Sequence, residues 1–470
     1  MIPETKIPGS YNDPNYYGGK NGLPKNVLKL AVVGAGISSG SLAVNTPQSV
    51  DSEDEAISYA GAGSVLHRMY LAAKAAWNYA VITLVRHAEP ADGTAAQWTL
   101  TFATTATKSG KIAYRIGSDT VTVYVSVGDT PAAKAAKMAA AINAKTALPV
   151  TAVAAEGVCT LTAKNVGEYI SGSLTFKVLV TDTDMTAAHA LTVAGTGDVD
   201  LTVALAAMFG ARYHLIAIDV SDAANIALLK THLDNAADAI RQRGQRGLVG
   251  FCGAKADVTA LGPGINSERI SVGATKTGYA APVWEIAAGM ASIYASNSKP
   301  NLPMNFEPIP GLPVPDVQDI WEDGAGGEQD TLLDAGIIPL VPVDGVLCIV
   351  RAITTRTLKD GVAFEKLIDT GIIAAFDYFR DCMIARDKAD FSKSVLFDNG
   401  QTSLRDAIKL AHYDVAKQLE KENLTRNVDD HKDEFTCDES TVAVGRVLCH
   451  SPATIVPGLI QIYTTIDLII

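Results

Sequence analysis

The chain has 470 residues, of which 48% are hydrophobic and 19% are charged. This length corresponds to about two to four domains, and the composition supplies enough apolar side chains to exclude a largely disordered chain. The formal net charge of −12 at pH 7 opposes non-specific binding to nucleic acid or to an anionic membrane surface.

Residues 1–30 are rich in proline, glycine, asparagine and tyrosine, and they lack the apolar run of a secretory signal peptide. We therefore expect a protein that is made and kept in a cytoplasm. Two aspartates and two prolines interrupt the most apolar later stretch, residues 332–353, so a membrane-spanning helix is not expected. The six cysteines show no CxxC spacing and are expected to be reduced thiols rather than disulfides or a metal site. They are Cys159, Cys252, Cys348, Cys382, Cys437 and Cys449.

An extended arm precedes the first predicted strand. Residues 1–26 contain repeated prolines and glycines, which favour extended backbone and turns. Val27–Val33 is a short apolar run that ends at a glycine-rich turn, which is typical of a buried strand in a parallel sheet. A helix over Val65–Tyr79 and a second strand over Val81–Val85 complete the first part of a core, residues 27–88.

Residues 89–200 have a different character, because their apolar residues alternate with polar ones at period two, as in half-buried antiparallel strands. Pro131 begins an alanine- and lysine-rich helix that ends near Thr146. The predicted strands are Trp98–Phe102, Val121–Val127, Val150–Ala155, Val158–Ala163 and Leu174–Val180. We therefore predict a separate, β-rich α+β domain.

The alternation of strands and helices resumes over residues 201–455. The predicted strands are His214–Ile218, Gly247–Cys252, Arg269–Val272, Gly345–Ile353 and Thr441–His450. The predicted helices are Ala223–Arg243, Pro282–Tyr294, Phe364–Ala389 and Ser403–Asn423. A parallel sheet that begins at Val27 and is completed after residue 200 indicates a domain inserted into a loop of a discontinuous core.

The chain is expected to end in a second arm, residues 456–470. Isoleucine and leucine alternate with polar residues in Leu459–Ile470, which predicts a strand with one apolar face. Such a strand has open backbone edges and is an aggregation hazard unless another strand pairs with it.

A glycine-rich segment, Gly34–Gly40, follows the first buried strand, at the position of a dinucleotide-binding fingerprint. Its spacing is GxGxxxG instead of GxGxxG, and neither a following helix nor a ribose-binding acid is expected. We favour a strand-to-loop turn. The alternative is a dinucleotide-dependent oxidoreductase on an α/β core.

The segment Gly278–Gly289 looks like the helix that follows the nucleophile of subtilisin-like proteases, whose pattern is GTSMAxP. Gly278 stands where the serine would be and Asp219 lacks the histidine motif, so no Ser-His-Asp relay is expected. The eight histidines show no HExxH spacing, and Asp429–Glu434 lacks an EF-hand pattern. We therefore expect no enzyme, no cofactor and no metal site. A hydrolase is the third interpretation.

Several segments resemble the contractile-tail sheath proteins of Mu-like bacteriophages. They are Ile2–Gly9, Leu148–Ala152 with the hairpin Val158–Asn165, Asp334–Leu340 and the terminal strand. Their order, the inserted β-rich unit and the two tails match the layout of this family over nearly the full length.

The resemblance implies an α/β fold: a sheath core with a mainly parallel sheet flanked by helices, subtilisin-like and non-catalytic, with an inserted β-rich domain and extended N- and C-terminal arms. It implies a structural subunit that polymerises in stacked rings around the inner tail tube and contracts, without ATP, to drive the tube through the host cell envelope. The implied partners are further copies of the chain, the tube protein, and baseplate and tail terminator proteins, without nucleic acid or membrane binding. The implied location is the virion tail, assembled in the bacterial host cytoplasm.

Three parts of the chain are candidates for these contacts. The arms are expected to pair with adjacent subunits through Ile2, Ile7, Tyr11, Tyr16, Ile460, Ile462, Ile466 and Leu468. The predicted helix Ser403–Asn423 carries cations at i,i+4 spacing, Arg405, Lys409, Lys417 and Lys421, and this row is the tube-facing candidate. Acidic neighbours on the same helix leave open an ordinary solvated face. The inserted domain is expected to form the outermost layer of the sheath.

Overall fold

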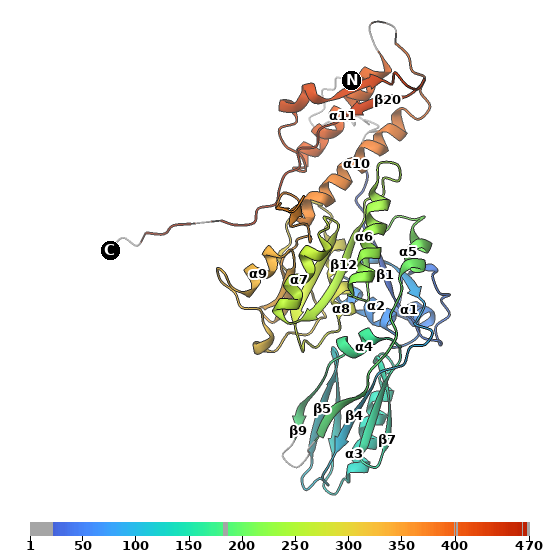
Figure 1. The fold of residues 1–470 in the computed structure, drawn as a ribbon, viewed down its shortest axis with the longest axis vertical. Coiled ribbons are helices and arrows are strands. Elements are labelled where there is room, and N and C mark those ends of the chain that lie inside the picture. Colours follow the sequence, from blue (N-terminus) through green and yellow to red (C-terminus); the bar gives the residue numbers. More distant parts are fainter. Residues whose placement is uncertain (1–21, 182–186, 399, 401–402, 463, 468–470) are drawn as a thin grey trace, which may run out of the picture. The chain divides into compact units, whose positions relative to one another are not determined.

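The computed structural model describes residues 22–181, 187–398, 400, 403–462 and 464–467 (Figure 1). The described residues form two compact units. One contains residues 27–377 and the C-terminal segment from Pro457, and the other contains Tyr378–Val456 together with residues 22–26. The sequence-based boundaries assign 201–455 to a single core, whereas these units divide that stretch at residue 378. The reason is that the second half of helix α10 (Thr370–Asp390) packs with helix α11 (Leu404–Lys421), and an ion pair of Arg386 with Asp414 links the two helices.

The larger unit is built on a nine-stranded sheet in the order β14-β16-β15-β13-β12-β11-β1-β3-β2. The strands are β1 (Lys29–Ala35), β2 (Pro47–Val50), β3 (Val81–His87), β11 (Leu215–Ile218), β12 (Arg246–Gly253), β13 (Ile270–Lys276), β14 (Asn305–Pro308), β15 (Ile338–Val343) and β16 (Val346–Arg351). The pairs from β3 through β15 are parallel, and β2, β14 and β16 pair antiparallel with their neighbours. The predicted mainly parallel sheet is therefore present.

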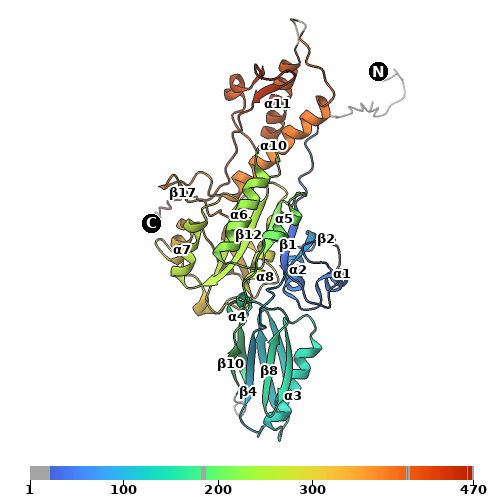
Figure 2. The ribbon, with the colours of Figure 1, turned by 45° about the vertical axis from the view of Figure 1, so that its right-hand side comes forward.

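Helices cover both faces of this sheet (Figure 2). Leu30 and Val32 of β1 belong to a cluster with α1 (Glu53–Ala60), α2 (Val65–Ala76) and α8 (Val283–Ser296). Ala31 and Val33 belong to the opposite cluster. The helices of that face are α5 (Thr202–Met208), α6 (Ala223–Ala237), α7 (Lys255–Ile265) and α9 (Glu328–Asp334). Burial on both faces explains why β1 is a continuous apolar run rather than an alternating one.

The β-rich segment between β3 and α5 contains two antiparallel sheets and two helices. One sheet has the order β10-β4-β8-β7 and the other β6-β5-β9. The elements are β4 (Gln97–Phe102), β5 (Gly110–Ile116), β6 (Asp119–Val125), α3 (Pro131–Ala144), β7 (Val150–Ala155), β8 (Val158–Ala163), α4 (Glu168–Ser173), β9 (Phe176–Thr181) and β10 (Ala187–Val193). Glu156 and Gly157 join β7 to β8 with φ of 47° and 91°, as a tight hairpin turn requires.

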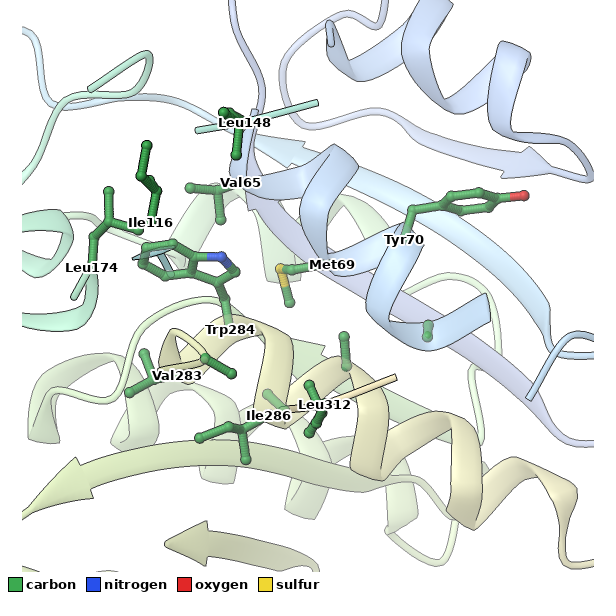
Figure 3. Packing of buried hydrophobic residues seen from close by; sticks show 14 of the residues in the cluster. Val65, Met69, Tyr70, Ile116, Leu148, Leu174, Val283, Trp284, Ile286 and Leu312 are labelled. Atoms are coloured by element: carbon green, nitrogen blue, oxygen red, sulfur yellow. The ribbon is translucent and has the colours of Figure 1, made fainter. Parts of the chain in front are cut away.

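The base of this segment packs directly on the sheet-covering helices. Trp284 of α8 is fully buried, and Figure 3 shows it beside Ile116 and Leu174 of the β-rich segment and Val65 of α2. All four side chains belong to one continuous hydrophobic cluster. The β-rich segment and the sheet therefore share part of their core.

The smaller unit contains the second half of α10, helix α11 and a hairpin of β19 (Thr436–Glu439) and β20 (Val447–His450). The predicted strand Thr441–His450 is therefore too long, because Ser440 Oγ accepts hydrogen bonds from the backbone of Val442 and Ala443 and turns the chain. On α11, Leu404, Ala411, Val415 and Leu419 are buried, and Ile408 between them is half-buried. The remaining short elements of the chain are η1 (Val317–Asp319), β17 (Leu358–Lys359), β18 (Val362–Ala363) and η2 (Asp429–Glu434).

One prediction about the C-terminal region, that all six cysteines are reduced thiols, is wrong for the described residues. Cys437 and Cys449 are joined by a disulfide, because the β19–β20 register places them opposite each other. The other four cysteines are free thiols, as expected.

Residues 459–462 and 464–467 form no strand, since a strand needs hydrogen bonds from a neighbour and this segment has no neighbouring strand among the described residues. Within the described ranges, no helix combines the length and apolar character needed to cross a bilayer.

Candidate assembly surfaces and the crevice of the sheet

The sheet contains a point where a ligand commonly binds in α/β proteins. Strand β1 has β11 on one side and β3 on the other, and the strand order runs in opposite directions from there. Ligands of such folds lie outside the carboxyl ends of the strands at this switch. In this sheet, the residues at the ends of β1, β3 and β11 lie at this switch.

Charged and polar side chains fill this position. Asp219 follows β11, and its Oδ2 accepts hydrogen bonds from the backbone N–H of Ala35 at 3.1 Å and from the Tyr169 hydroxyl at 3.2 Å. Nε2 of His87, the last residue of β3, lies 2.8 Å from the same oxygen, and the His87 and Asp219 side chains are 0% exposed. Burial alone lowers the pKa of His87, but the charge and hydrogen bond of Asp219 outweigh it, so the pKa of His87 is raised. His87 and Asp219 therefore form a buried, hydrogen-bonded pair between the ends of β3 and β11.

The glycine-rich segment serves the packing of a loop. The chain after β1 continues as a loop to β2, and helix α1 begins only at Glu53. The helix that would follow β1 directly and hold a pyrophosphate at its N-terminus is therefore replaced by a loop. A Cβ atom on Gly40 would lie 2.4 Å from the carbonyl oxygen of Tyr59, so this glycine permits a close approach to the end of α1. The structure gives no support to the oxidoreductase alternative.

The segment that looks like a protease nucleophile region is a buried helix. Helix α8 begins at Val283, and thirteen of its fourteen residues are buried. Gly278 has φ of 92°, and nothing lies within 4 Å of the position of a Cβ atom. The side chain needed for nucleophilic attack is absent at this position, as the sequence indicated.

Part of the predicted C-terminal arm surface lies in the described residues. Ile460, Ile462 and Ile466 are 39%, 76% and 87% exposed. The segment touches its own unit where the Asn305 side-chain amide of edge strand β14 donates a 3.2 Å hydrogen bond to the Leu459 carbonyl. The remaining predicted arm residues, Ile2, Ile7, Tyr11, Tyr16 and Leu468, lie outside the described residues.

The four cations of the predicted tube-facing row lie on α11, but they are not equivalent. Arg405 Nη2 lies 2.7 Å from Asp398 Oδ2. Lys417 Nζ lies 3.1 Å from Asp429 Oδ2 and also pairs with Glu420. Among the described residues, Lys409 and Lys421 have no recorded ion pair, and Lys421 is exposed. Half of the row is therefore neutralised within the subunit.

Sequence reasoning missed two groups of side chains. Arg68 of α2 bridges Asp119 of the β-rich segment at 2.6 Å and Glu285 of α8 at 2.8 Å. In the smaller unit, the potential ligand atoms of His412, Cys437 and Cys449 lie within 4.8 Å of one another. No local sequence pattern predicts either group, because only the tertiary fold brings their members together.

Comparison with known proteins finds one matching family model and a related curated protein. Residues 194–355, which contain β11 to β16, match the family described as phage tail sheath protein central domain. The Mu-like prophage FluMu tail sheath protein of Haemophilus influenzae is 24% identical over 424 residues, which cover 85% of this chain and 83% of that protein.

Solved sheath tail proteins from two bacteria are also similar. That of Desulfitobacterium hafniense has a TM-score of 0.49 and 13% identity, with 92% of this chain and 93% of that chain covered. That of Listeria innocua has a TM-score of 0.48 and 14% identity, with 87% of each chain covered. The family match and the curated relative confirm the resemblance found in the sequence: residues 194–355 match the central domain of phage tail sheath proteins, and the chain is similar over most of its length to a Mu-like tail sheath protein.

Proposed function

We propose that this structural protein polymerises as stacked rings around the inner tail tube and contracts to drive the tube through the host cell envelope. The sheath-family domain over residues 194–355 carries the proposal. The core is the subtilisin-like, non-catalytic body of the subunit, and the partners are the tube, the baseplate and the tail terminator. Energy is stored as inter-subunit contacts that form only on contraction, when cores rotate and move outward into a better-packed lattice.

The C-terminal segment supplies one inter-subunit contact in this proposal. Ile460, Ile462 and Ile466 are exposed, and their segment pairs with no strand among the residues that the structure describes. These features fit addition to the sheet of an adjacent subunit, because strand pairing satisfies the backbone and buries alternate side chains. We assign the same role to the N-terminal arm, residues 1–26, with Ile2, Ile7, Tyr11 and Tyr16 as its contacts.

Deletion of residues 459–470, or of residues 2–21, should leave folded subunits that form no sheath in negative-stain electron micrographs. The sharper test exchanges the apolar face alone, as Ile460→Ser/Ile462→Ser/Ile466→Ser. Its matched control changes the alternate face, as Gln461→Ser/Thr465→Ser/Asp467→Ser. Assembly should fail in the first variant and persist in the second. Normal sheaths from the deletion or isoleucine variants would contradict strand exchange.

The β-rich segment, residues 89–200, is proposed to be the outermost layer and to contribute little to the lattice. Deleting it with a short linker between Arg86 and Leu201 tests this, but the deletion also uncovers Trp284. A peptide tag after Gly128, where the structure leaves open space, avoids that problem. Tagged subunits should assemble and bind a tag antibody along the whole sheath, and failure to bind would place this segment inside.

The tube-facing surface is proposed to be the cationic row of α11, where screened charge pairs worth at most about 1 kcal/mol each can release during contraction. Because Lys417 is already paired, Lys409→Glu/Lys421→Glu is the more selective variant. It should prevent assembly on the tube while tube-free polysheath still forms, and adding Lys417→Glu should not restore tube binding. Lys388→Glu/Lys393→Glu, at exposed positions of the same unit, is the control. Equal tube binding by both double variants would remove α11 from this role.

A further inference from the structure

Three potential metal ligands meet in the smaller unit. His412 lies on α11, Cys437 on β19 and Cys449 on β20. Their ligand atoms all lie within 4.8 Å of one another. The antiparallel register pairs Cys437 with Cys449, which is why the two sulfurs are close enough to be bonded in this structure.

His412 is held in the manner of a metal-binding histidine. It is 7% exposed on the buried face of α11. Its Nε2 lies 2.8 Å from Asp387 Oδ1, and its Nδ1 lies 2.9 Å from Ser451 Oγ. A carboxylate on one ring nitrogen fixes the tautomer and the ring orientation and leaves the other nitrogen as a ligand.

The hairpin that carries the cysteines has little apolar burial to hold it. None of the eight residues of β19 and β20 is buried. Its recorded links to α11 include the Ser451–His412 hydrogen bond and the edge-to-face contact of Phe435 with Tyr413, whose ring centroids are 5.6 Å apart. Small units with thin cores commonly need a disulfide or a structural metal to hold such an element.

We propose that the reduced form of this site binds Zn²⁺ through the thiolates of Cys437 and Cys449 and one ring nitrogen of His412. Two thiolates and an imidazole are a typical zinc donor set, and water or the Ser451 hydroxyl completes the tetrahedron. Asp387 acts as the supporting carboxylate. The metal would join α11, β19 and β20 at one point.

The thiol chemistry makes metal binding conditional on reduction. A dithiol reductant transfers two electrons to the disulfide, and two protons convert its sulfurs to thiols while the reductant becomes a disulfide. Zn²⁺ then displaces the two thiol protons as it binds. The oxidised form lacks both thiolates, so the same hairpin is cross-linked either by the disulfide or by the metal. A reducing cytoplasm favours the metal form.

The test uses the full-length protein. The chain is reduced with a phosphine, the phosphine is removed under nitrogen, and Zn²⁺ is titrated in competition with a chromophoric chelator. We expect one high-affinity Zn²⁺ per chain, and thiolate-to-metal charge-transfer absorption when Co²⁺ replaces it. Cys437→Ser/Cys449→Ser should lose both signals, whereas Cys382→Ala, which removes a free buried thiol of the same unit, should keep them.

Two further variants separate a metal site from a fold defect. Asp387→Asn keeps all three ligands and should weaken Zn²⁺ binding about 10- to 100-fold. His412→Gln should weaken binding while the cobalt–thiolate absorption remains, and circular dichroism checks that each variant is folded. The proposal is wrong if folded, reduced wild-type protein binds no Zn²⁺. It is also wrong if the oxidised protein, or the double serine variant, binds Zn²⁺ as tightly as the reduced protein.

Discussion

The two compact units of this chain are stabilised in different ways. In the larger unit, six of the seven residues of β1 are buried, and both faces of the sheet are covered. In the smaller unit, the strands β19 and β20 bury no residue, a disulfide joins the two strands, and contacts such as the Ser451–His412 hydrogen bond link their hairpin to α11. Apolar burial is therefore the main source of stability in the larger unit, whereas specific cross-links contribute a larger share of the stability of the smaller unit.

This difference predicts which changes each unit tolerates. Loss of volume or of a buried charge should damage the larger unit, because its close-packed interior cannot rearrange freely. Reduction of the Cys437–Cys449 disulfide and removal of the Ser403 cap of α11 should act mainly on the smaller unit. The following predictions test that contrast, beginning with the largest effect.

Trp284→Ala should lower the free energy of unfolding of the larger unit by about 3–5 kcal/mol, because it removes a fully buried indole. Denaturant unfolding monitored by circular dichroism measures this loss. Tyr79→Ala is the control, since Tyr79 is 79% exposed. A loss below about 1 kcal/mol for Trp284→Ala would mean that the base of the β-rich segment is not a packed core.

Arg68→Leu should cost about 3 kcal/mol, because it leaves the carboxylate of Glu285, only 4% exposed, without its cationic partner. Adding Glu285→Gln removes the uncompensated charge and should recover part of the loss. The same unfolding measurement compares the single and double variants. If the double variant loses as much stability as the two single variants lose together, the Arg68 and Glu285 side chains are not coupled.

Stability of the larger unit should fall as the pH drops from about 6.5 to 4. Burial, followed by the charges of Arg212, Arg246 and Lys29, lowers the pKa of His214 to about 4, so the unfolded chain binds a proton in this range before the folded one does. Between pH 7 and pH 5, the free energy of unfolding of the His214→Asn variant should therefore fall by about 1–2 kcal/mol less than that of the wild type. Parallel stability curves for the two proteins would show that His214 does not contribute.

Ser403→Ala should cost about 1 kcal/mol, since Ser403 Oγ accepts the hydrogen bond from the Asp406 backbone that caps α11. Asp222→Ala removes the equivalent cap of α6 in the larger unit, where Asp222 accepts from the Asn225 backbone at 2.9 Å. Amide hydrogen exchange should show that Ser403→Ala loosens α11 and spares α6. Equal loosening of both helices would show that the two units unfold together.

Local patterns were sufficient for much of the larger unit. The hairpin Val150–Ala155 and Val158–Ala163 has the predicted bounds, because its turn residues set the register. Helix α6 ends at Ala237 rather than at Arg243, since Asp238 accepts hydrogen bonds from the backbone of Ile240 and Arg241 and forms a turn there. Strands β2, β5 and β10 were not predicted, and their short or weakly alternating sequences owe their structure to neighbouring strands.

The contacts within the candidate sites depend on pairing over long distances in the chain. The Cys437–Cys449 link could not be deduced from a spacing motif, because it follows from the β19–β20 register. The apolar alternation of Leu459–Ile470 was visible, but a strand also requires hydrogen-bonding partners, and the chain's own described residues supply none. The cationic row lies on one helix, α11, as the sequence predicts, whereas two of its ion pairs involve Asp398 and Asp429, which lie outside that helix.

Because the base of the β-rich segment shares its core with the sheet-covering helices, the orientation of that segment should report the orientation of the sheet. Since Trp284 and the Arg68 bridge join it to α2 and α8, we expect it to turn together with them. A fluorophore placed after Gly128, where a Cβ atom would have no neighbour within 4 Å, would then follow the orientation of α2 and α8. The time course of polarised fluorescence from single labelled particles would then measure when and how fast the orientation of the subunit changes.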